Sequence, residues 1–113
     1  MDIISELTRT LQDRLEADPE NSYVASLYAA GVDRILQKVG EEATEVVIAA
    51  KDAAAGATDS GTAGDAVIHE VADLWFHTMV LLVHLGRSPE EVLKLLDKRF
   101  GLSGLEEKRS RNR

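Results

Sequence analysis

The sequence predicts an all-α protein, a bundle of about four to five helices. Apolar residues recur at helical spacing along most of the chain, and helix-capping residues stand before several of these segments. No segment shows the alternating apolar and polar pattern that is typical of a strand. The 113 residues form a single domain, residues 1–113, which buries only a limited core alone. A partner subunit is therefore expected to contribute to the core.

The first half of the chain is predicted to contain three helices. Residues 2–16 form an amphipathic helix, and a loop over residues 17–21 follows it. Ser22 caps a short helix, which ends at residue 30. A long helical pattern then covers residues 32–55.

The second half begins with a loop of small and polar residues, 56–64, after which Asp65 is the expected N-cap of a helix that ends at Gly86. Residues 88–91, Ser-Pro-Glu-Glu, have the capping-box pattern with proline at the first helical position. The helix that they open is predicted to run to about Lys98.

The charge is unevenly distributed along the chain. Residues 1–97 carry 7 Lys and Arg against 18 Asp and Glu, whereas residues 98–113 carry 6 against 2. An acidic body argues against a nucleic-acid groove. The basic tail, residues 100–113, is expected to be flexible; it suits a phosphate-bearing ligand, although a solvated chain end explains its charge equally simply.

Cysteine content and hydropathy bear on the compartment. The absence of cysteine excludes disulfides and thiolate metal sites. The first residues show no secretory signal, and residues 71–85 are too short and too polar for a membrane span. A cytoplasmic protein is expected.

The long helix over residues 32–55 has one acidic face and one apolar face. At about 100° per residue, one face contains Lys38, Glu41, Glu42, Glu45 and Asp52. The opposite face contains Leu36, Val39, Ala43, Val47 and Ala50. Taken alone, this pattern describes an ordinary amphipathic helix with one face in solvent.

The next helix is apolar nearly all round over residues 71–85 and is predicted to be buried. Glu70, Asp73 and His77 nevertheless lie on one stripe of it, and His84 lies two turns further along. An ionised carboxylate in a dry core costs several kcal/mol unless it is paired or binds a metal. The two histidines are interpreted as hydrogen-bonded core residues, with His77 a partner for Asp73.

Antiparallel packing of these two helices would bring four carboxylates together: Glu42, Glu45, Glu70 and Asp73. Like charges so close disfavour joint ionisation unless a cation lies between them. A set of oxygen ligands selects Mg²⁺ or Mn²⁺ over zinc. The alternative is a chance seam of salt-bridged carboxylates, which is harder to sustain because Lys38 is the only basic residue on either face.

Two motifs carry a resemblance to a known family. Glu42-Ala-Thr-Glu45 and Glu70-Val-Ala-Asp73 resemble the paired ExxE and ExxD motifs of the all-α nucleoside triphosphate pyrophosphatases. Within that group, residues 2–111 are similar to the phosphoribosyl-ATP pyrophosphatases, most clearly over 18–27, 31–52, 70–82 and 99–109. Trp75-Phe76 departs from the family pattern, which affects packing and not the carboxylates.

The resemblance implies hydrolysis of phosphoribosyl-ATP to phosphoribosyl-AMP and pyrophosphate in histidine biosynthesis. It also implies Mg²⁺, with Mn²⁺ as a substitute, and a homodimer that completes the bundle and has its site near the subunit interface. The implied metal ligands are Glu42, Glu45, Glu70 and Asp73, and the catalytic candidates are Glu41, Glu42 and Glu45. The implied phosphate-binding residues are Lys38, Lys51, Arg99, Lys108 and Arg109.

Two other functions fit the same residues. One is a MazG-like housekeeping pyrophosphatase that acts on free nucleoside triphosphates. The other is a helical dimerisation or regulatory module without enzymatic activity, in which Mg²⁺ only stabilises the acidic seam.

Overall fold

The structure, a computed structural model, describes residues 2–56 and 60–101, and these ranges contain helices and no strand. In chain order the elements are α1 (Ile3–Asp13), the short 3₁₀ helix η1 (Arg14–Glu16), α2 (Tyr23–Ala30), α3 (Val32–Ala54), α4 (Ser60–His84) and α5 (Pro89–Phe100). The all-α prediction is confirmed.

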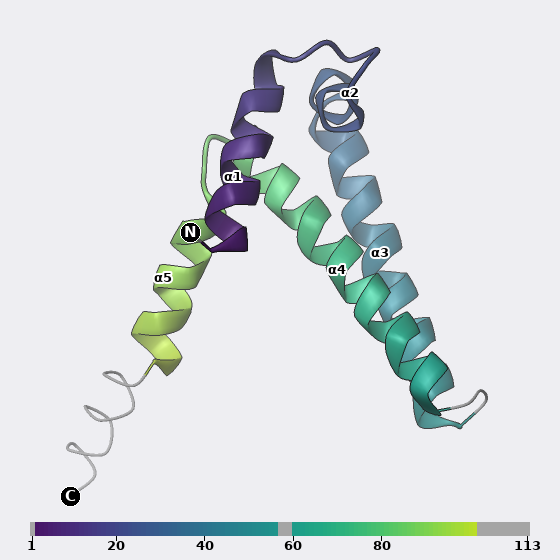
Figure 1. Cartoon of the computed structure of the whole chain (residues 1–113). Coiled ribbons are helices and arrows are strands. Elements are labelled where there is room, and N and C mark those ends of the chain that lie inside the picture. Colours follow the sequence, from purple (N-terminus) through teal and green to yellow (C-terminus); the bar gives the residue numbers. More distant parts are fainter. Residues whose placement is uncertain (1, 57–59, 102–113) are drawn as a thin grey trace, which may run out of the picture.

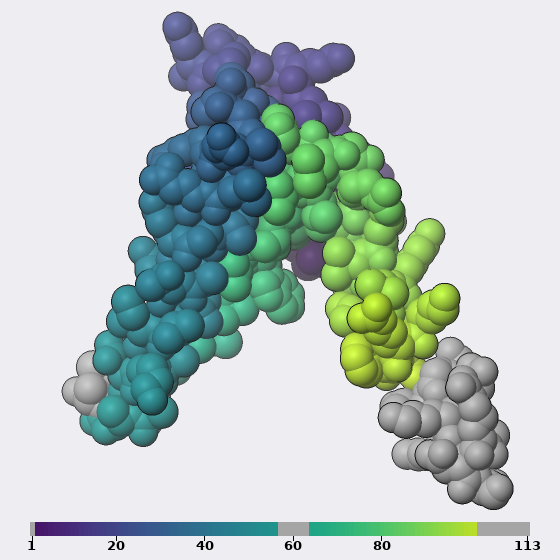
Figure 2. Space-filling view, turned by 180° about the vertical axis from the view of Figure 1, so that it is seen from behind, coloured from purple at the N-terminus to yellow at the C-terminus, as the bar shows by residue number. Residues whose placement is uncertain are grey.

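The helices form two arms that diverge from a common junction (Figure 1). One arm is the antiparallel hairpin of α3 and α4, whose helices lie side by side. The other arm contains α1 and α5, and α2 lies at the junction beside the start of α3. Seen from behind, the two arms enclose a hollow (Figure 2).

The core lies at this junction, where α1, α2, α3 and α4 meet. Its buried apolar side chains are Leu11, Leu27, Ile35, Met79, Val80 and Val83. Burying a side chain of this size stabilises the fold by about 1.5–3 kcal/mol. The core therefore fixes the C-terminal half of α4 against the start of α3, and the rest of the hairpin extends from that contact.

Local capping signals start and separate the helices as the sequence predicts. The Ser22 hydroxyl accepts a hydrogen bond from the amide of Ala25 at the start of α2. Ser88 and Glu91 form a complete capping box at the start of α5. Gly31 separates α2 from α3 with a φ of 100°, a left-handed conformation that residues other than glycine rarely adopt.

The predicted start of α4 is wrong, because the helix begins at Ser60 and Asp65 lies inside it. Residues 57–59 of the predicted loop lie outside the described residues. The glycines at 61 and 64 cost a helix on the order of 1 kcal/mol each relative to alanine. Helix α4 as a whole packs along α3, and tertiary contacts supply most of a helix's stability in a protein, so the local preference of these residues does not decide where the helix begins.

The predicted burial of α4 on all sides is also wrong for the single chain. Trp75 and Leu85 are 61% and 57% exposed. Most of the apolar face of α3 is exposed too, with Leu36 at 47% and Val47 at 60%. Trp75 lies in an apolar groove of about 310 Å³ between α1, α4 and α5. Exposed apolar grooves are often found where a protein binds a partner.

Residues 64–84 of α4 are long and apolar enough, with a mean hydropathy of 1.4, to cross a membrane. The core helix of a soluble protein passes the same test, so this is weak evidence for a span. Helix α4 packs against α1, α3 and α5, which is the environment of a helix in a bundle.

Candidate metal centre

Three carboxyl groups converge where α3 and α4 face each other. Glu42 and Glu45 lie one turn apart on α3, and Glu70 lies on α4. Each offers one oxygen atom, and the three oxygens lie within 4.8 Å of one another. The antiparallel hairpin therefore brings together three of the four predicted metal ligands, although Glu70 is 25 residues beyond Glu45 in sequence.

Two of these carboxyl oxygens are buried without a hydrogen-bond partner. They are Oε2 of Glu42 and Oε2 of Glu70, and the whole Glu42 residue is only 7% exposed. A buried polar atom without a partner is costly. A cation between the carboxylates would satisfy both atoms, and a ligand set of carboxylate oxygens fits Mg²⁺ or Mn²⁺.

The cluster also perturbs its own acid–base equilibria. Burial raises the pKa of Glu42, and the negative charges of Glu45 and Asp73 raise it further. A hydrogen bond to Glu45 raises the pKa of Glu70, and desolvation adds to that effect. Without a cation, Glu42 and Glu70 therefore retain protons to higher pH than ordinary carboxyl groups do.

Asp73, the fourth predicted ligand, lies at the edge of the cluster. Its side chain is 41% exposed, and its Oδ2 lies 3.4 Å from Nε2 of His69. Its negative charge still raises the pKa values of Glu42 and Glu70. Sequence reasoning missed His69, although its position four residues before Asp73 on the same helix is the usual spacing of a side-chain pair.

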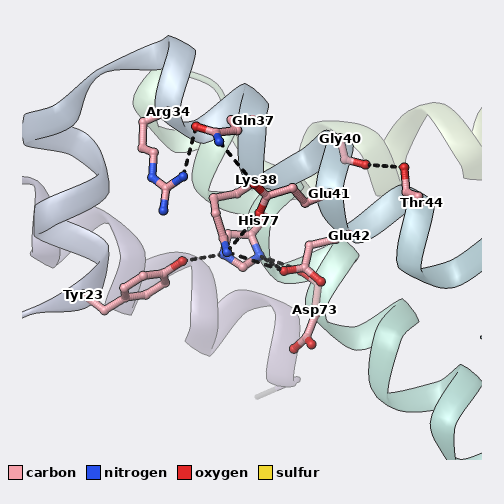
Figure 3. Close-up of polar contacts among 10 residues, drawn as sticks. All are labelled: Tyr23, Arg34, Gln37, Lys38, Gly40, Glu41, Glu42, Thr44, Asp73 and His77. Atoms are coloured by element: carbon pink, nitrogen blue, oxygen red, sulfur yellow. Dashed lines mark hydrogen bonds and ion pairs between the residues drawn. The ribbon is translucent and has the colours of Figure 1, made fainter.

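Lys38 and Glu41 lie on the side of α3 next to Glu42 (Figure 3). The Lys38 Nζ is 3.4 Å from Oε2 of Glu41 and 4.0 Å from Oε1 of Glu42. The carboxylate of Glu41 also accepts a hydrogen bond from Gln37. Glu41 is thus held beside Lys38 and is not among the three converging carboxylates, while Lys38 adjoins them.

His77 occupies the space between α2, α3 and α4 and is 6% exposed. Its Nε2 lies 2.9 Å from the Tyr23 hydroxyl, and its Nδ1 lies 2.9 Å from the backbone oxygen of Asp73 and 3.8 Å from Oε1 of Glu42 (Figure 3). His77 is thus a hydrogen-bonded core histidine, as predicted. Tyr23 was missed, because no local pattern connects residues that are 54 positions apart.

The other predicted residues that the structure describes lie away from the cluster. Lys51 is exposed in the last turn of α3, about 9 Å beyond Glu45 along the helix axis. Arg99 is exposed near the end of α5, on the other arm of the molecule (Figure 1). His84 stacks on Tyr28 with ring centroids 5.7 Å apart. Lys108 and Arg109 lie outside the described residues.

The fold and this cluster together define an all-helical protein with a candidate centre for a hard divalent cation. Residues 4–100 match the model of the family described as phosphoribosyl-ATP pyrophosphohydrolase. The chain therefore belongs to the phosphoribosyl-ATP pyrophosphohydrolase family, and the resemblance seen in the sequence is confirmed.

Curated relatives agree with this assignment, and each is named phosphoribosyl-ATP pyrophosphatase. The protein of Cupriavidus metallidurans is 56% identical over 97% of this chain and 92% of its own length. The protein of Hydrogenovibrio crunogenus is 53% identical over 99% of this chain and 95% of its own length. The protein of Methylococcus capsulatus is 51% identical over 98% of this chain and 97% of its own length. The matches therefore span nearly the whole of each protein.

Proposed function

We propose that this protein hydrolyses phosphoribosyl-ATP to phosphoribosyl-AMP and pyrophosphate, the second step of histidine biosynthesis, in the cytoplasm. The observation that carries the proposal is the convergence of Glu42, Glu45 and Glu70, with two buried oxygens left without partners, in a member of this family. A site of this kind suits a substrate that arrives with phosphates and a divalent cation.

The proposed metal ligands are Glu42, Glu45, Glu70 and Asp73, with Asp73 turning inward from the edge of the cluster. Mg²⁺ bound there would neutralise phosphate charge and lower the pKa of the attacking water. The water oxygen attacks the α-phosphorus, and the bond from that phosphorus to the bridging oxygen breaks to release pyrophosphate. Lys38, which adjoins the cluster, would contact a phosphate oxygen.

The proton of the attacking water needs a carboxylate acceptor, for which Glu41, Glu42 and Glu45 are the candidates. Glu45 is the strongest of these, because it is exposed to solvent and also belongs to the cluster. Glu42 is buried, and Glu41 is engaged by Lys38 and Gln37. Glu41 is therefore better placed to hold Lys38 than to accept the proton.

The active form is proposed to be a homodimer in which a second copy covers the exposed apolar surface. That surface comprises the apolar face of α3 and the groove around Trp75. Arg99 lies on the arm opposite the carboxylates of its own chain (Figure 1), so it would contact substrate only at the site of the second copy. Lys51, by contrast, belongs to the hairpin itself.

The dimer can be tested by sedimentation and by the fluorescence of Trp75, the single tryptophan. We expect a dimeric mass and the short-wavelength emission of a buried indole. Val47→Glu should yield monomers with emission at longer wavelength, because it places a charge on the apolar face. Leu15→Glu is the control, since Leu15 is similarly exposed but lies at the junction, in η1. A monomeric wild type would refute the dimer.

The activity itself is tested by measuring pyrophosphate release from phosphoribosyl-ATP beside ATP and dUTP, each with Mg²⁺ and with EDTA. Release from phosphoribosyl-ATP alone, abolished by EDTA, is the expected result. Release mainly from the free triphosphates would indicate a MazG-like housekeeping pyrophosphatase instead. No release from any substrate would refute the enzyme proposal.

A further inference from the structure

The contacts of His77 determine which of its nitrogens carries the hydrogen in the neutral ring. A backbone carbonyl can only accept a hydrogen bond, so the contact to the Asp73 oxygen makes Nδ1 the donor. Nε2 is then the acceptor, and the hydroxyl of Tyr23 donates to it. The Tyr23 ring also meets the imidazole edge-on, with centroids 6.0 Å apart. The Asp73 carbonyl therefore fixes the tautomer of His77, and the hydroxyl of Tyr23 holds the orientation of the ring at Nε2.

The Nδ1–H edge of His77 faces one particular oxygen of Glu42. Nδ1 lies 3.8 Å from Oε1 of Glu42, and the Lys38 Nζ lies 4.0 Å from the same atom. Two positive or partly positive groups thus converge on Oε1. The other oxygen, Oε2, is buried and has no hydrogen-bond partner. The two oxygens of this carboxyl group consequently have different environments: Oε1 lies near Nδ1 of His77 and Nζ of Lys38, and Oε2 has no hydrogen-bond partner.

We infer that His77 is a positioning residue for Glu42, and that Tyr23 acts through His77 to direct Oε2 of Glu42 toward the cation. This inference rests on the proposed metal centre. It adds a role for α2, which contributes no carboxylate to that centre. Outer partners of this type orient a metal ligand and restrict its rotation, and their loss typically weakens metal binding by about 10- to 100-fold.

Helix α2 supplies its own control for Tyr23. Tyr28 lies on the same helix and also donates its hydroxyl hydrogen, to the backbone oxygen of Leu11 at 2.9 Å. Its ring stacks on His84 instead of His77. Tyr23→Phe and Tyr28→Phe therefore each remove one hydroxyl and one hydrogen bond from α2, but only the first change touches the chain of contacts that leads to Glu42.

The first measurement is made on metal-free protein, with long-range ¹H–¹⁵N spectra of the histidine rings. Wild type should show the neutral His77 ring protonated at Nδ1. In Tyr23→Phe the ¹⁵N resonance of Nε2 should shift, because this nitrogen loses its donor, while Tyr28→Phe should leave it unchanged. A wild-type ring protonated at Nε2 would overturn the inference.

The second measurement is calorimetric titration of the metal-free protein with Mn²⁺, without substrate. Tyr23→Phe should weaken binding by about five- to tenfold, at the low end of the range for outer partners because it acts one contact further away. His77→Asn, which retains an N–H near the position of Nδ1, should bind more tightly than His77→Leu. Circular dichroism checks that each variant is folded.

The Mn²⁺ titrations distinguish a failure of the positioning role from a failure of the proposed metal centre. If Tyr23→Phe binds Mn²⁺ as tightly as wild type, or if Tyr28→Phe weakens binding equally, the positioning role is wrong and the metal centre stands. If wild type binds no Mn²⁺, the metal centre fails, and the role of His77 toward it fails with it.

Discussion

One carboxyl oxygen of Glu45 on α3 and one of Glu70 on α4 lie within 4.8 Å of each other across the hairpin. The interaction with Glu45 raises the pKa of Glu70, so Glu70 keeps its proton to higher pH than an ordinary carboxyl group does. A cation bound by the same oxygens would displace that proton. Hydrogen ions and metal ions therefore compete for the same small space.

Mg²⁺ binding should consequently release protons and strengthen as the pH rises. The raised pKa values of Glu42 and Glu70 mean that these groups stay protonated above the ordinary range, so Mg²⁺ must displace protons there. The affinity should rise through the window just above the ordinary carboxyl pKa of 4.5 and level off at higher pH. Calorimetry in buffers of different ionisation enthalpy measures the released protons, and a binding constant independent of pH would contradict this prediction.

Glu45→Gln should reduce kcat/KM by at least about 100-fold, because it removes a proposed ligand and the strongest candidate for the proton acceptor. Asp52→Asn is the matched control, an exposed carboxylate on the same helix outside the cluster. It should retain activity within about twofold, since its charge is screened by solvent. Pyrophosphate release measures both variants. Equal activity of the two would remove Glu45 from the site.

Mixing two inactive variants tests whether one site draws on both chains. If Arg99 acts at the site of the second copy, a mixed dimer of Glu45→Gln and Arg99→Ala retains one intact site. Re-associated mixtures should then recover about one quarter of wild-type activity, because half of the dimers are mixed and each has one working site. If Arg99 acts at the site of its own chain, the mixture recovers no activity. If Arg99→Ala is active alone, Arg99 is not needed at either site.

Tyr28 should make the fold sensitive to alkali. Burial raises the pKa of this hydroxyl from 10.0 to about 12, so the folded chain holds the proton more tightly than the unfolded chain does. This contribution to the free energy of unfolding is complete below pH 10 and is lost as the pH rises toward 12. Urea unfolding at pH 8 and pH 11 should show a steeper loss for wild type than for Tyr28→Phe. Equal losses would contradict the assignment.

The sequence predicted the helices best where a local signal marks them. Ser22 and Ser88 cap the helices as expected, and the antiparallel hairpin follows from two long helical patterns joined by a short linker. The start of α4 was misjudged because glycine and serine are poor helix formers, and only contact with α3 reveals why they are helical here.

Helical spacing in the sequence predicted which carboxylates share a helix face, but not how the two helices bring them together. Spacing placed Glu42 and Glu45 on one face, and the cost of carboxylates in an apolar helix pointed to Glu70 and Asp73. Spacing could not show that Asp73 lies at the edge of the cluster or that Tyr23 contacts His77. Those relationships depend on the angle between helices and on contacts between distant residues, which periodicity does not encode.

The single uninterrupted helix α4 contains both carboxylates of the proposed metal centre and residues of the hydrophobic core. Glu70 lies toward the hairpin tip, and Met79, Val80 and Val83 anchor the other half in the core. A rotation by one residue about the helix axis, about 100°, would take Glu70 off the face toward α3. The packing of Met79, Val80 and Val83 therefore sets which face of α4 presents Glu70 to α3, so a substitution that changes this packing also displaces a carboxyl group of the proposed metal centre.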